Sequence, residues 1–303
     1  MKVLAIIVTY NGAQWIQKCI SSLMENTLVP QILIVDNAST DNTLEIVSKN
    51  FRNVEIIKSE ENLGFGKANN IGLKKVLEKE IDYAFLLNQD AWIDKNCITE
   101  LVSIAAKNKE YGILSPFHFN WEGTKIDSYF LRMANPNDCP NFLNDTLMKR
   151  QNEVYDIKFI HAACWLITKN CLQKVGGFDP LFFHYGEDND LAARVILKQL
   201  KIGICPRTSV YHLGAFDIEK PNDSKLRHLK EVETLLRLKR LDQTLGGNYF
   251  YFFKESFDKS TSLIFSRKIK SAFQNIRNTF YFLKFYSKIK SSRKDSKNPN
   301  AFL

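Results

Sequence analysis

Tyr83-Ala84-Phe85-Leu86-Leu87-Asn88-Gln89-Asp90 is an apolar run of strand length that ends abruptly in three polar side chains. Earlier apolar runs of the same kind, each followed by a polar or glycine-containing loop, are residues 3–9, 31–35 and 54–58. Segments with the three- and four-residue apolar spacing of helices lie between them: residues 13–26, 43–50 and 67–79. This alternation predicts an α/β fold with a mostly parallel central sheet flanked by helices.

Polar residues follow each of the four predicted strands, at residues 9–11, 36–37, 62–66 and 88–90. The carboxyl ends of parallel strands meet at one edge of a sheet, and open α/β sheets bind ligands beyond that edge. The sequence therefore predicts one ligand site built from four segments that are distant along the chain.

The middle of the chain is less regular. Residues 111–160 are typical of one or two strands with a long loop. Two further strands and two helices are predicted, at residues 159–168 and 203–210 and at residues 170–175 and 187–199, respectively. The last of these strands leads directly to His212.

The character of the sequence changes near residue 224. An amphipathic helical pattern begins there, and we expect Gly246-Gly247-Asn248 to end it. A second helical pattern runs over residues 269–283, and we expect residues 291–303 to be disordered. These patterns predict a main domain at residues 1–223 and a basic helical extension at residues 224–303.

The charge is distributed unevenly between these two parts. The net charge is +9, but residues 1–223 carry 24 Lys+Arg and 27 Asp+Glu, whereas residues 224–303 carry 18 and 6. A basic extension suits an anionic partner such as a membrane surface, although a packing helix with a solvated basic face has the same pattern. The acidic main domain shows no nucleic-acid recognition motif, so we do not expect a nucleic-acid partner.

The cysteines and the apolar runs bear on the cellular compartment. None of the six cysteines forms a Cys-x-x-Cys pair, which favours reduced thiols. The first apolar run is too short for a signal peptide, and no stretch is apolar over about 18 residues. We expect a cytoplasmic protein that associates with the membrane at most peripherally.

Two aspartates end predicted strands. Asp90 stands where a carboxylate can hold Mg²⁺ or Mn²⁺ between diphosphate oxygens, and Asp36 could accept hydrogen bonds from a pyrimidine base. Aspartate is also common in turns and at helix starts, so neither residue is informative alone.

Glu187 and Asp188 open a predicted helix and form a second candidate carboxylate site. A general base needs a carboxylate within reach of the acceptor hydroxyl, but acids are also frequent at helix starts, where they stabilise the helix dipole. His212 could complete a metal site with Asp90, and His161 and His184 are weaker candidates.

The loop Asn62-Leu63-Gly64-Phe65-Gly66-Lys67-Ala68-Asn69 invites comparison with a dinucleotide-binding loop. The third glycine of that motif is replaced by Asn69, and the acidic residue that should follow is absent from its expected place. We therefore discount NAD and expect the glycines to let the backbone approach another ligand.

Taken together and in order, these segments resemble glycosyltransferase family 2 on the GT-A fold, and its rhamnosyltransferase-like branch in particular. The matching segments, which span about residues 1–215, are residues 7–11, 34–41, 62–72, 86–90, 176–179, 182–191 and 210–212. The family's Asp-x-Asp metal motif corresponds here to Asn88-Gln89-Asp90, with an amide in place of the first acid.

The resemblance implies a role for each motif. Asp90 and His212 would hold the metal, and Asp188, with Glu187 beside it, would be the base. Residues implied in donor-nucleotide binding are Thr9, Tyr10, Asn11, Asp36, Asn37, Asn62, Gly64, Gly66, Asn69, Asn88 and Gln89.

The implied activity is an inverting transfer of a sugar from a nucleoside diphosphate, with Mg²⁺ or Mn²⁺, in cell-surface polysaccharide synthesis. The resemblance favours dTDP-rhamnose as donor, with UDP-sugars behind it, and a glycan or lipid-linked oligosaccharide as acceptor. The alternative is a non-catalytic nucleotide-sugar-binding or assembly protein that retains the fold.

Overall fold

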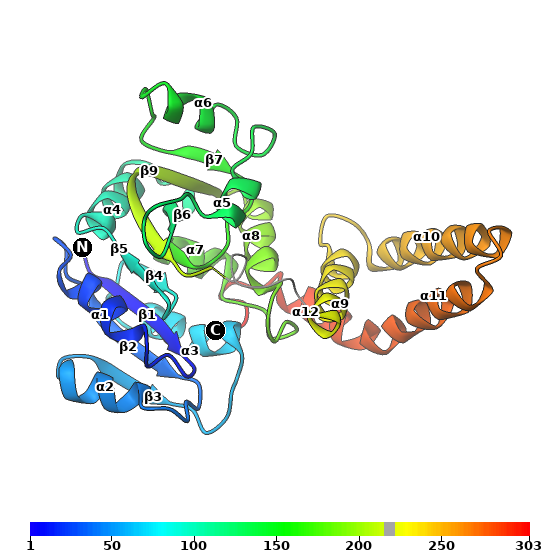
Figure 1. Ribbon diagram of the computed structural model, residues 1–303, viewed down its shortest axis with the longest axis horizontal. Coiled ribbons are helices and arrows are strands. Elements are labelled where there is room, and N and C mark those ends of the chain that lie inside the picture. Colours follow the sequence, from blue (N-terminus) through cyan, green and yellow to red (C-terminus); the bar gives the residue numbers. More distant parts are fainter. Residues whose placement is uncertain (215–221) are drawn as a thin grey trace. The chain divides into compact units, whose positions relative to one another are not determined.

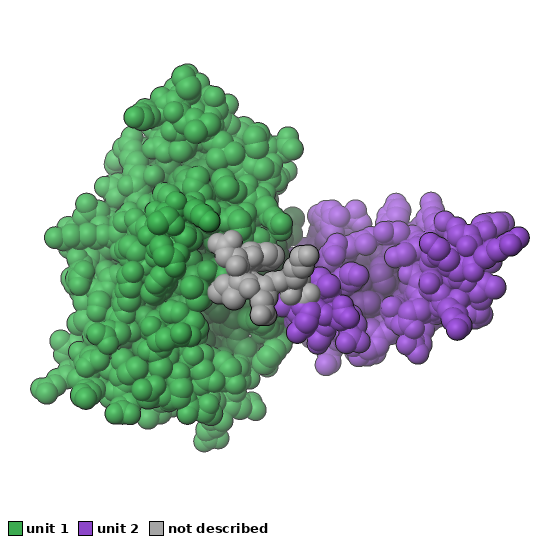
Figure 2. Space-filling model, in the orientation of Figure 1, with its two compact units in different colours: residues 1–220, 299–303 green, residues 221–298 purple. Residues whose placement is uncertain are grey.

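The computed structural model describes residues 1–214 and 222–303. The chain divides into two compact units, which Figure 2 colours green and purple. Unit 1 contains residues 1–220 together with residues 299–303, and unit 2 contains residues 221–298. The last five residues, which the sequence assigns to the extension, thus belong to the first unit.

Unit 1 is built from nine strands and eight helices within the residues described (Figure 1). The strands are β1 (Val3–Thr9), β2 (Gln31–Asp36), β3 (Glu55–Lys58), β4 (Tyr83–Leu87), β5 (Ala91–Ile93), β6 (Tyr111–Asn120), β7 (Tyr155–Ile157), β8 (Cys164–Thr168) and β9 (Lys201–His212). The helices are α1 (Ile16–Met24), α2 (Thr43–Asn50), α3 (Phe65–Glu78), α4 (Cys97–Lys107), α5 (Ser128–Met133), α6 (Phe142–Leu147), α7 (Lys169–Val175) and α8 (Glu187–Leu197).

The strands form one mixed sheet in the order β3-β2-β1-β4-β8-β6-β9-β5, and β7 also pairs with β9. The first four strands, β1 to β4, are parallel to one another, as the sequence predicts, and β6 is parallel to β9. Strand β8 runs antiparallel between β4 and β6. Its first residues therefore lie at the edge of the sheet where β4 ends.

Helices cover both faces of this sheet because its strands are apolar on both faces. Val3, Ala5 and Ile7 pack in a core layer with α1, α2 and α4. Leu4 and Ile6 face the opposite layer, which contains the apolar side chains of α3, α7 and α8. This two-sided burial explains why the strands have continuous apolar sequences, and it confirms the predicted α/β class.

The irregular middle of the chain contains more structure than the sequence indicates. The segment from residue 111 to 160 holds β6, two short helices and β7. The Asp127 carboxylate caps α5 by accepting a hydrogen bond from the Phe130 N–H at 2.7 Å. Helix α4 follows β5 and belongs to a stretch for which we made no prediction.

Unit 2 consists of helices within the residues described: α9 (Asp223–Lys239), α10 (Leu245–Phe265), α11 (Ile269–Tyr281), a 3-10 helix (Phe282–Phe285) and α12 (Tyr286–Asp295). The prediction that Gly246-Gly247-Asn248 ends a helix is wrong, because these residues lie in the first turn of α10. The Thr244 hydroxyl accepts a hydrogen bond from the Gly247 N–H and so begins the helix. None of the helices described is long and apolar enough to cross a bilayer.

The predicted disorder of residues 291–303 is also wrong. Helix α12 extends to Asp295, and the last residues pack on unit 1 as a strap, residues 299–303. The Ala301 carbonyl accepts a hydrogen bond from the Gly177 N–H at 2.8 Å, and Ala301 is buried. The sequence conceals this packing because residues 291–300 are mostly polar.

Candidate active site

The predicted site residues gather at the edge of the sheet where β1, β2 and β4 end. Strand β5 follows Asp90 directly and pairs antiparallel with β9, so that Ala91 lies opposite His212. Because β8 runs the other way, its first residue, Cys164, pairs with Leu87, the last residue of β4. The strands thus bring residues near 36, 90, 161 and 212 to one edge.

Thr9 and Asp36 are buried at this edge and are hydrogen-bonded to each other. The Thr9 hydroxyl donates to Asp36 Oδ1 at 2.8 Å, and the Ser39 N–H donates to Asp36 Oδ2 at 3.1 Å. Asp36 is only 2% exposed and Thr9 is fully buried. Both carboxylate oxygens therefore already hold the loop that follows β2, and base recognition by Asp36 stays a prediction.

Tyr10, Asn11 and Gln89 hold the neighbouring loops together. The Gln89 amide makes two hydrogen bonds of 3.0 Å with the backbone of Tyr10, one to its N–H and one to its carbonyl. Asn11 has a positive φ of 50°, and its side-chain oxygen accepts from the Thr40 N–H at 2.8 Å. The Tyr10 side chain is half exposed at this edge, and its contact with a donor nucleotide stays a prediction.

Asn37 and Asn62 shape the loop that precedes α3. The Asn37 amide donates to Asn62 Oδ1 at 2.8 Å and accepts from the Leu63 N–H at 2.7 Å. Asn62 Oδ1 also accepts from the Gly64 N–H at 2.9 Å. The two amides therefore fix the loop by hydrogen bonds within the protein.

Gly64 and Gly66 permit a close approach to the protein's own chain. Gly64 has a φ of 79°, and a Cβ there would lie 2.2 Å from the Phe183 carbonyl oxygen. A Cβ on Gly66 would lie 2.9 Å from the Phe178 Cβ. The glycines thus seat the segment that leads to Glu187, and their contact with a diphosphate stays a prediction.

Asn69 is buried in the second turn of α3. It is 1% exposed, and its amide donates to the Phe65 carbonyl one turn earlier in α3. This side chain makes its hydrogen bond within the helix, and its contact with the donor stays a prediction.

Asp90 and His212 form a partly buried pair. The His212 Nε2 atom lies 3.5 Å from Asp90 Oδ1 and 3.3 Å from the Asn88 side-chain nitrogen. Burial disfavours both charges, but the hydrogen bond and charge of His212 lower the pKa of Asp90 below its ordinary value. Against the same burial, Asp90 and Asp127 raise the pKa of His212.

The donor set of this pair fits a divalent cation. Asp90 offers a carboxylate oxygen, and His212 offers an imidazole nitrogen of the kind that binds Mn²⁺ more readily than Mg²⁺. Within the residues described, the buried atoms Asn88 Oδ1 and His212 Nδ1 have no hydrogen-bond partner. Buried polar atoms are usually satisfied, so a ligand or water is expected here.

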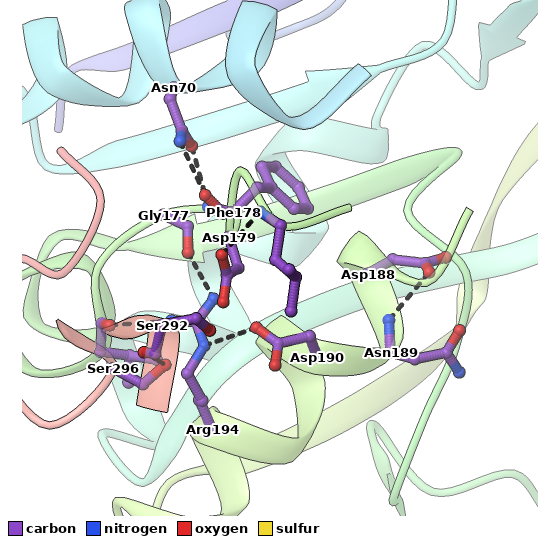
Figure 3. Close-up of polar contacts among 12 residues, drawn as sticks. Asn70, Gly177, Phe178, Asp179, Asp188, Asn189, Asp190, Arg194, Ser292 and Ser296 are labelled. Carbon is purple, nitrogen blue, oxygen red and sulfur yellow. Dashed lines mark hydrogen bonds and ion pairs between the residues drawn. The ribbon is translucent and has the colours of Figure 1, made fainter. Parts of the chain in front are cut away.

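Glu187 and Asp188 lie in the first turn of α8, after Gly186 with a φ of 89°. Burial, and then the Asp188 charge, raise the pKa of Glu187 to about 8. Burial raises the pKa of Asp188 to about 6, although hydrogen bonds from the Asn189 and Ala162 N–H groups lower it. Figure 3 shows the bond from Asn189 to Asp188, which is 2.8 Å long. Near pH 7, therefore, Glu187 is mostly protonated and Asp188 mostly ionised.

Arg194 connects helix α8 to the segment that precedes it. Its guanidinium donates to Asp190 at 2.8 Å, to the Val175 carbonyl at 3.0 Å and to the Gly177 carbonyl at 2.5 Å. Figure 3 shows Arg194 reaching from α8 toward both Asp190 and Gly177. Arg194 is 1% exposed, so it ties α8 to the preceding turn through buried contacts.

Asn70 fixes the same turn from the side of α3. Its amide exchanges two hydrogen bonds of 2.8 Å with the backbone of Phe178, as Figure 3 shows, and donates a third to the Phe302 carbonyl. The turn at residues 176–178, which precedes the Asp188 helix, is therefore held by both α3 and the strap.

A series of contacts connects the two predicted carboxylates. Asp188 accepts a hydrogen bond from the Ala162 N–H, and His161 is the preceding residue. The ring centres of His161 and His212 are 5.7 Å apart, and His212 contacts Asp90. Asp90 and Asp188 thus lie at the same edge of the sheet.

His161 was only a weak candidate in the sequence, and Asp127 was not a candidate. His161 precedes β8 instead of following a strand, so the rule that ligands lie after parallel strands does not find it. Asp127 precedes a short helix in the irregular region. The one available signal is the residue type, because histidine and aspartate are common metal ligands.

Comparison with known proteins gives a consistent assignment. The chain is 24% identical over 218 residues to the N-acetylglucosaminyl-diphospho-decaprenol L-rhamnosyltransferase of Mycobacterium tuberculosis, which covers 63% of this chain and 69% of that protein. It is 28% identical over 218 residues to the O-antigen chain rhamnosyltransferase WbaN of Salmonella anatum, which covers 68% and 64%, respectively.

The fold is similar to that of a solved glycosyltransferase structure. The S. aureus TarS fragment 1–349 in complex with UDP superposes with a TM-score of 0.54 at 18% identity, over 82% of this chain and 69% of that one. This similarity confirms the GT-A fold that the sequence resemblance implies. The sequence profile of "Glycosyl transferase family 2" matches residues 4–176, more than half of the chain. The chain therefore belongs to glycosyl transferase family 2 and is an inverting glycosyltransferase.

Proposed function

We propose that this enzyme transfers rhamnose from dTDP-rhamnose to a lipid-linked glycan at the cytoplasmic face of the membrane, with the help of Mg²⁺ or Mn²⁺. The observation that carries the proposal is the presence of Asp90, His212 and Asp188 at one edge of the sheet. The relatives that are named rhamnosyltransferases favour this donor over UDP-sugars.

The reaction follows from the states of the two carboxyl groups. Ionised Asp188 accepts the proton of the acceptor hydroxyl, whose oxygen forms a bond to the anomeric carbon from the face opposite the diphosphate. The bond from that carbon to the diphosphate oxygen breaks in the same displacement, so the anomer inverts. Asp90 and His212 would hold the cation, which when bound neutralises charge on the departing diphosphate.

A thermal-shift screen tests the donor. The unaltered chain would be heated with dTDP-rhamnose, UDP, UDP-GlcNAc or UDP-galactofuranose, each with and without Mn²⁺. At 100 times its Kd, a ligand stabilises the folded state by about 2.7 kcal/mol, which is about 5–10 °C for a unit of this size. We expect the largest shift for dTDP-rhamnose, and only with Mn²⁺.

Two results of this screen would contradict the proposal. A larger shift with a UDP-sugar than with dTDP-rhamnose would exclude rhamnose as the preferred donor. Equal shifts with and without Mn²⁺ would exclude a metal that bridges protein and diphosphate.

The turn between α10 and α11 supports a membrane-bound acceptor. Ile264, Phe265 and Ile269 are exposed there, and Phe265 is 90% exposed. Arg267 and Lys268 lie between them in the sequence. Exposed apolar side chains beside cations suit the headgroup region of an anionic bilayer. We propose that this turn binds the membrane surface.

The variant Phe265→Ser/Ile269→Ser tests the membrane contact. Each lost side chain removes on the order of 1.5–3 kcal/mol of apolar transfer energy, so we expect binding to phosphatidylglycerol vesicles to fall at least about tenfold in co-sedimentation. The matched control is Leu147→Ser/Met148→Ser, which removes two exposed apolar side chains from the end of α6 in unit 1. Equal binding by the parent and by Phe265→Ser/Ile269→Ser would refute this contact.

A further inference from the structure

Three potential metal ligands converge beside the proposed donor site. Asp127 follows β6 and caps α5, His161 precedes β8, and His212 ends β9. One ligand atom from each lies within 4.8 Å of the other two. Asp127 and His161 are buried, with 7% and 9% exposure. The antiparallel course of β8 brings His161 to this edge, where β6 and β9 end together.

The two imidazoles of this cluster carry unsatisfied atoms. His161 Nε2 and His212 Nδ1 are buried and have no hydrogen-bond partner among the residues that the structure describes. A buried polar atom without a partner costs about 1–3 kcal/mol. Two such atoms in a cluster with one carboxylate indicate a binding site for a group other than the residues described.

Asp127 can offer one carboxylate oxygen to a cation. The Asp127 carboxylate uses Oδ1 to cap α5, which leaves Oδ2 outside that bond. A Cβ on Gly214 would lie 3.0 Å from Oδ2, so glycine keeps this oxygen uncrowded.

We propose that Asp127, His161 and His212 form a two-histidine, one-carboxylate site for a transition-metal dication, with Mn²⁺ bound in preference to Mg²⁺. Imidazole nitrogen favours Mn²⁺ and later metals, whereas Mg²⁺ prefers oxygen and retained water. The inference rests on the proposed function only in that it shares His212. It differs by making His161 and Asp127 ligands and by placing Asp90 outside this set of three.

The proposed site lies next to a peptide group that contacts the proposed base, Asp188. His161 is joined by one peptide bond to Ala162, whose N–H donates to the Asp188 carboxylate. A cation on His161 would therefore fix the peptide that orients the proposed base. The ring centre of Tyr129 lies 5.4 Å from that of His161. Burial, and then the charge of Asp188, raise the pKa of Tyr129, so Tyr129 lies near both groups.

Mn²⁺ binding to the full chain without nucleotide tests the site. Free Mn²⁺ would be followed by its electron paramagnetic resonance signal. We expect His161→Gln and Asp127→Asn each to weaken Mn²⁺ binding at least about tenfold, and Mg²⁺ to compete only at a large excess. His228→Gln, which changes an exposed histidine of unit 2, is the control and should not alter the affinity.

A second measurement needs no substitution. Electron spin-echo modulation of bound Mn²⁺ detects directly coordinated imidazole nitrogen, and we expect two such nitrogens in the unaltered chain. It decides the question even if His161→Gln does not fold, which circular dichroism would reveal.

The outcomes separate this site from the proposed function. One coordinated nitrogen, with Mn²⁺ affinity lost in Asp90→Asn and unchanged in His161→Gln, overturns the three-residue site and leaves metal-dependent transfer through Asp90 and His212 intact. Absence of Mn²⁺ binding with or without nucleotide overturns both. Two nitrogens, together with the loss in His161→Gln, establish the site whichever donor is used.

Discussion

Asp188→Asn should lower the kcat/KM of sugar transfer by about 10²–10⁴-fold while donor binding stays nearly unchanged. Asparagine keeps the shape of the side chain but cannot take the acceptor proton. Transfer would be measured with dTDP-rhamnose and a lipid-linked acceptor, and donor binding by calorimetry. A non-catalytic nucleotide-sugar-binding protein would show no transfer to lose, so the parent enzyme itself distinguishes that alternative.

Two further variants serve as controls for Asp188→Asn. Asp82→Asn changes an exposed aspartate at the opposite end of β4 and should leave kcat/KM unchanged. Glu187→Gln should cost much less than Asp188→Asn, because Glu187 is already mostly neutral near pH 7. Equal losses in Glu187→Gln and Asp188→Asn would contradict the assignment of Asp188 as the base.

The dependence of kcat/KM on pH in the parent enzyme should reveal the titration of Asp188. Since the pKa of Asp188 is raised to about 6, its ionised form is lost as the pH falls below 6, and kcat/KM should fall with it. The groups that face this carboxyl are Glu187, Tyr129 and the N–H groups of Ala162 and Asn189. Folding raises the pKa, so this group's contribution to stability is lost as the pH rises through 6. Asp188→Asn should therefore melt no lower than the parent at pH 8.

Arg194→Met should lower the free energy of unfolding of unit 1 by about 3–5 kcal/mol, the cost of removing one partner from a buried ion pair. The change takes away the cation that offsets the charge of buried Asp190, along with the donors to the Val175 and Gly177 carbonyls. Thermal unfolding followed by circular dichroism measures the loss.

The chain offers a matched control for this pair. Lys74 and Glu78 have the same four-residue spacing on α3, but both side chains are well exposed. Lys74→Met should change stability by only about 0.3–0.5 kcal/mol. Similar losses in Lys74→Met and Arg194→Met would show that burial does not set the strength of the Arg194 contacts.

The sequence predicts the parallel half of the fold well because there each element depends on local pattern. Strand β4 and helix α2 have the predicted bounds, since an apolar run and a helical spacing are properties of adjacent residues. The pairing of Asp90 with His212 was a hypothesis from residue type that the family resemblance reinforced, and the β5–β9 ladder places the two residues together.

The wrong or missing predictions share a physical cause. The direction of a strand and the tertiary contacts of a segment depend on residues that are distant in the sequence. Nothing near His161 in the sequence shows that β8 runs antiparallel, so its place at the ligand edge could not be predicted. Gly246 and Gly247 are poor helix formers, yet the Thr244 cap places them in a first turn, where the penalty is offset. The strap follows a mostly polar stretch, and its order comes from tertiary contacts, among them those of Phe302 with Asn70 and of Ala301 with Gly177.

The strap also sets the order in which the enzyme can mature. Asn70 contacts Phe302, which is 232 positions further along the chain. During synthesis, the sheet and α3 emerge long before residues 299–303, and all of unit 2 is translated between them. The turn that precedes the Asp188 helix therefore receives its last contacts only when translation reaches the strap, so a shorter nascent chain lacks the bond of Ala301 to Gly177 and that of Phe302 to Asn70.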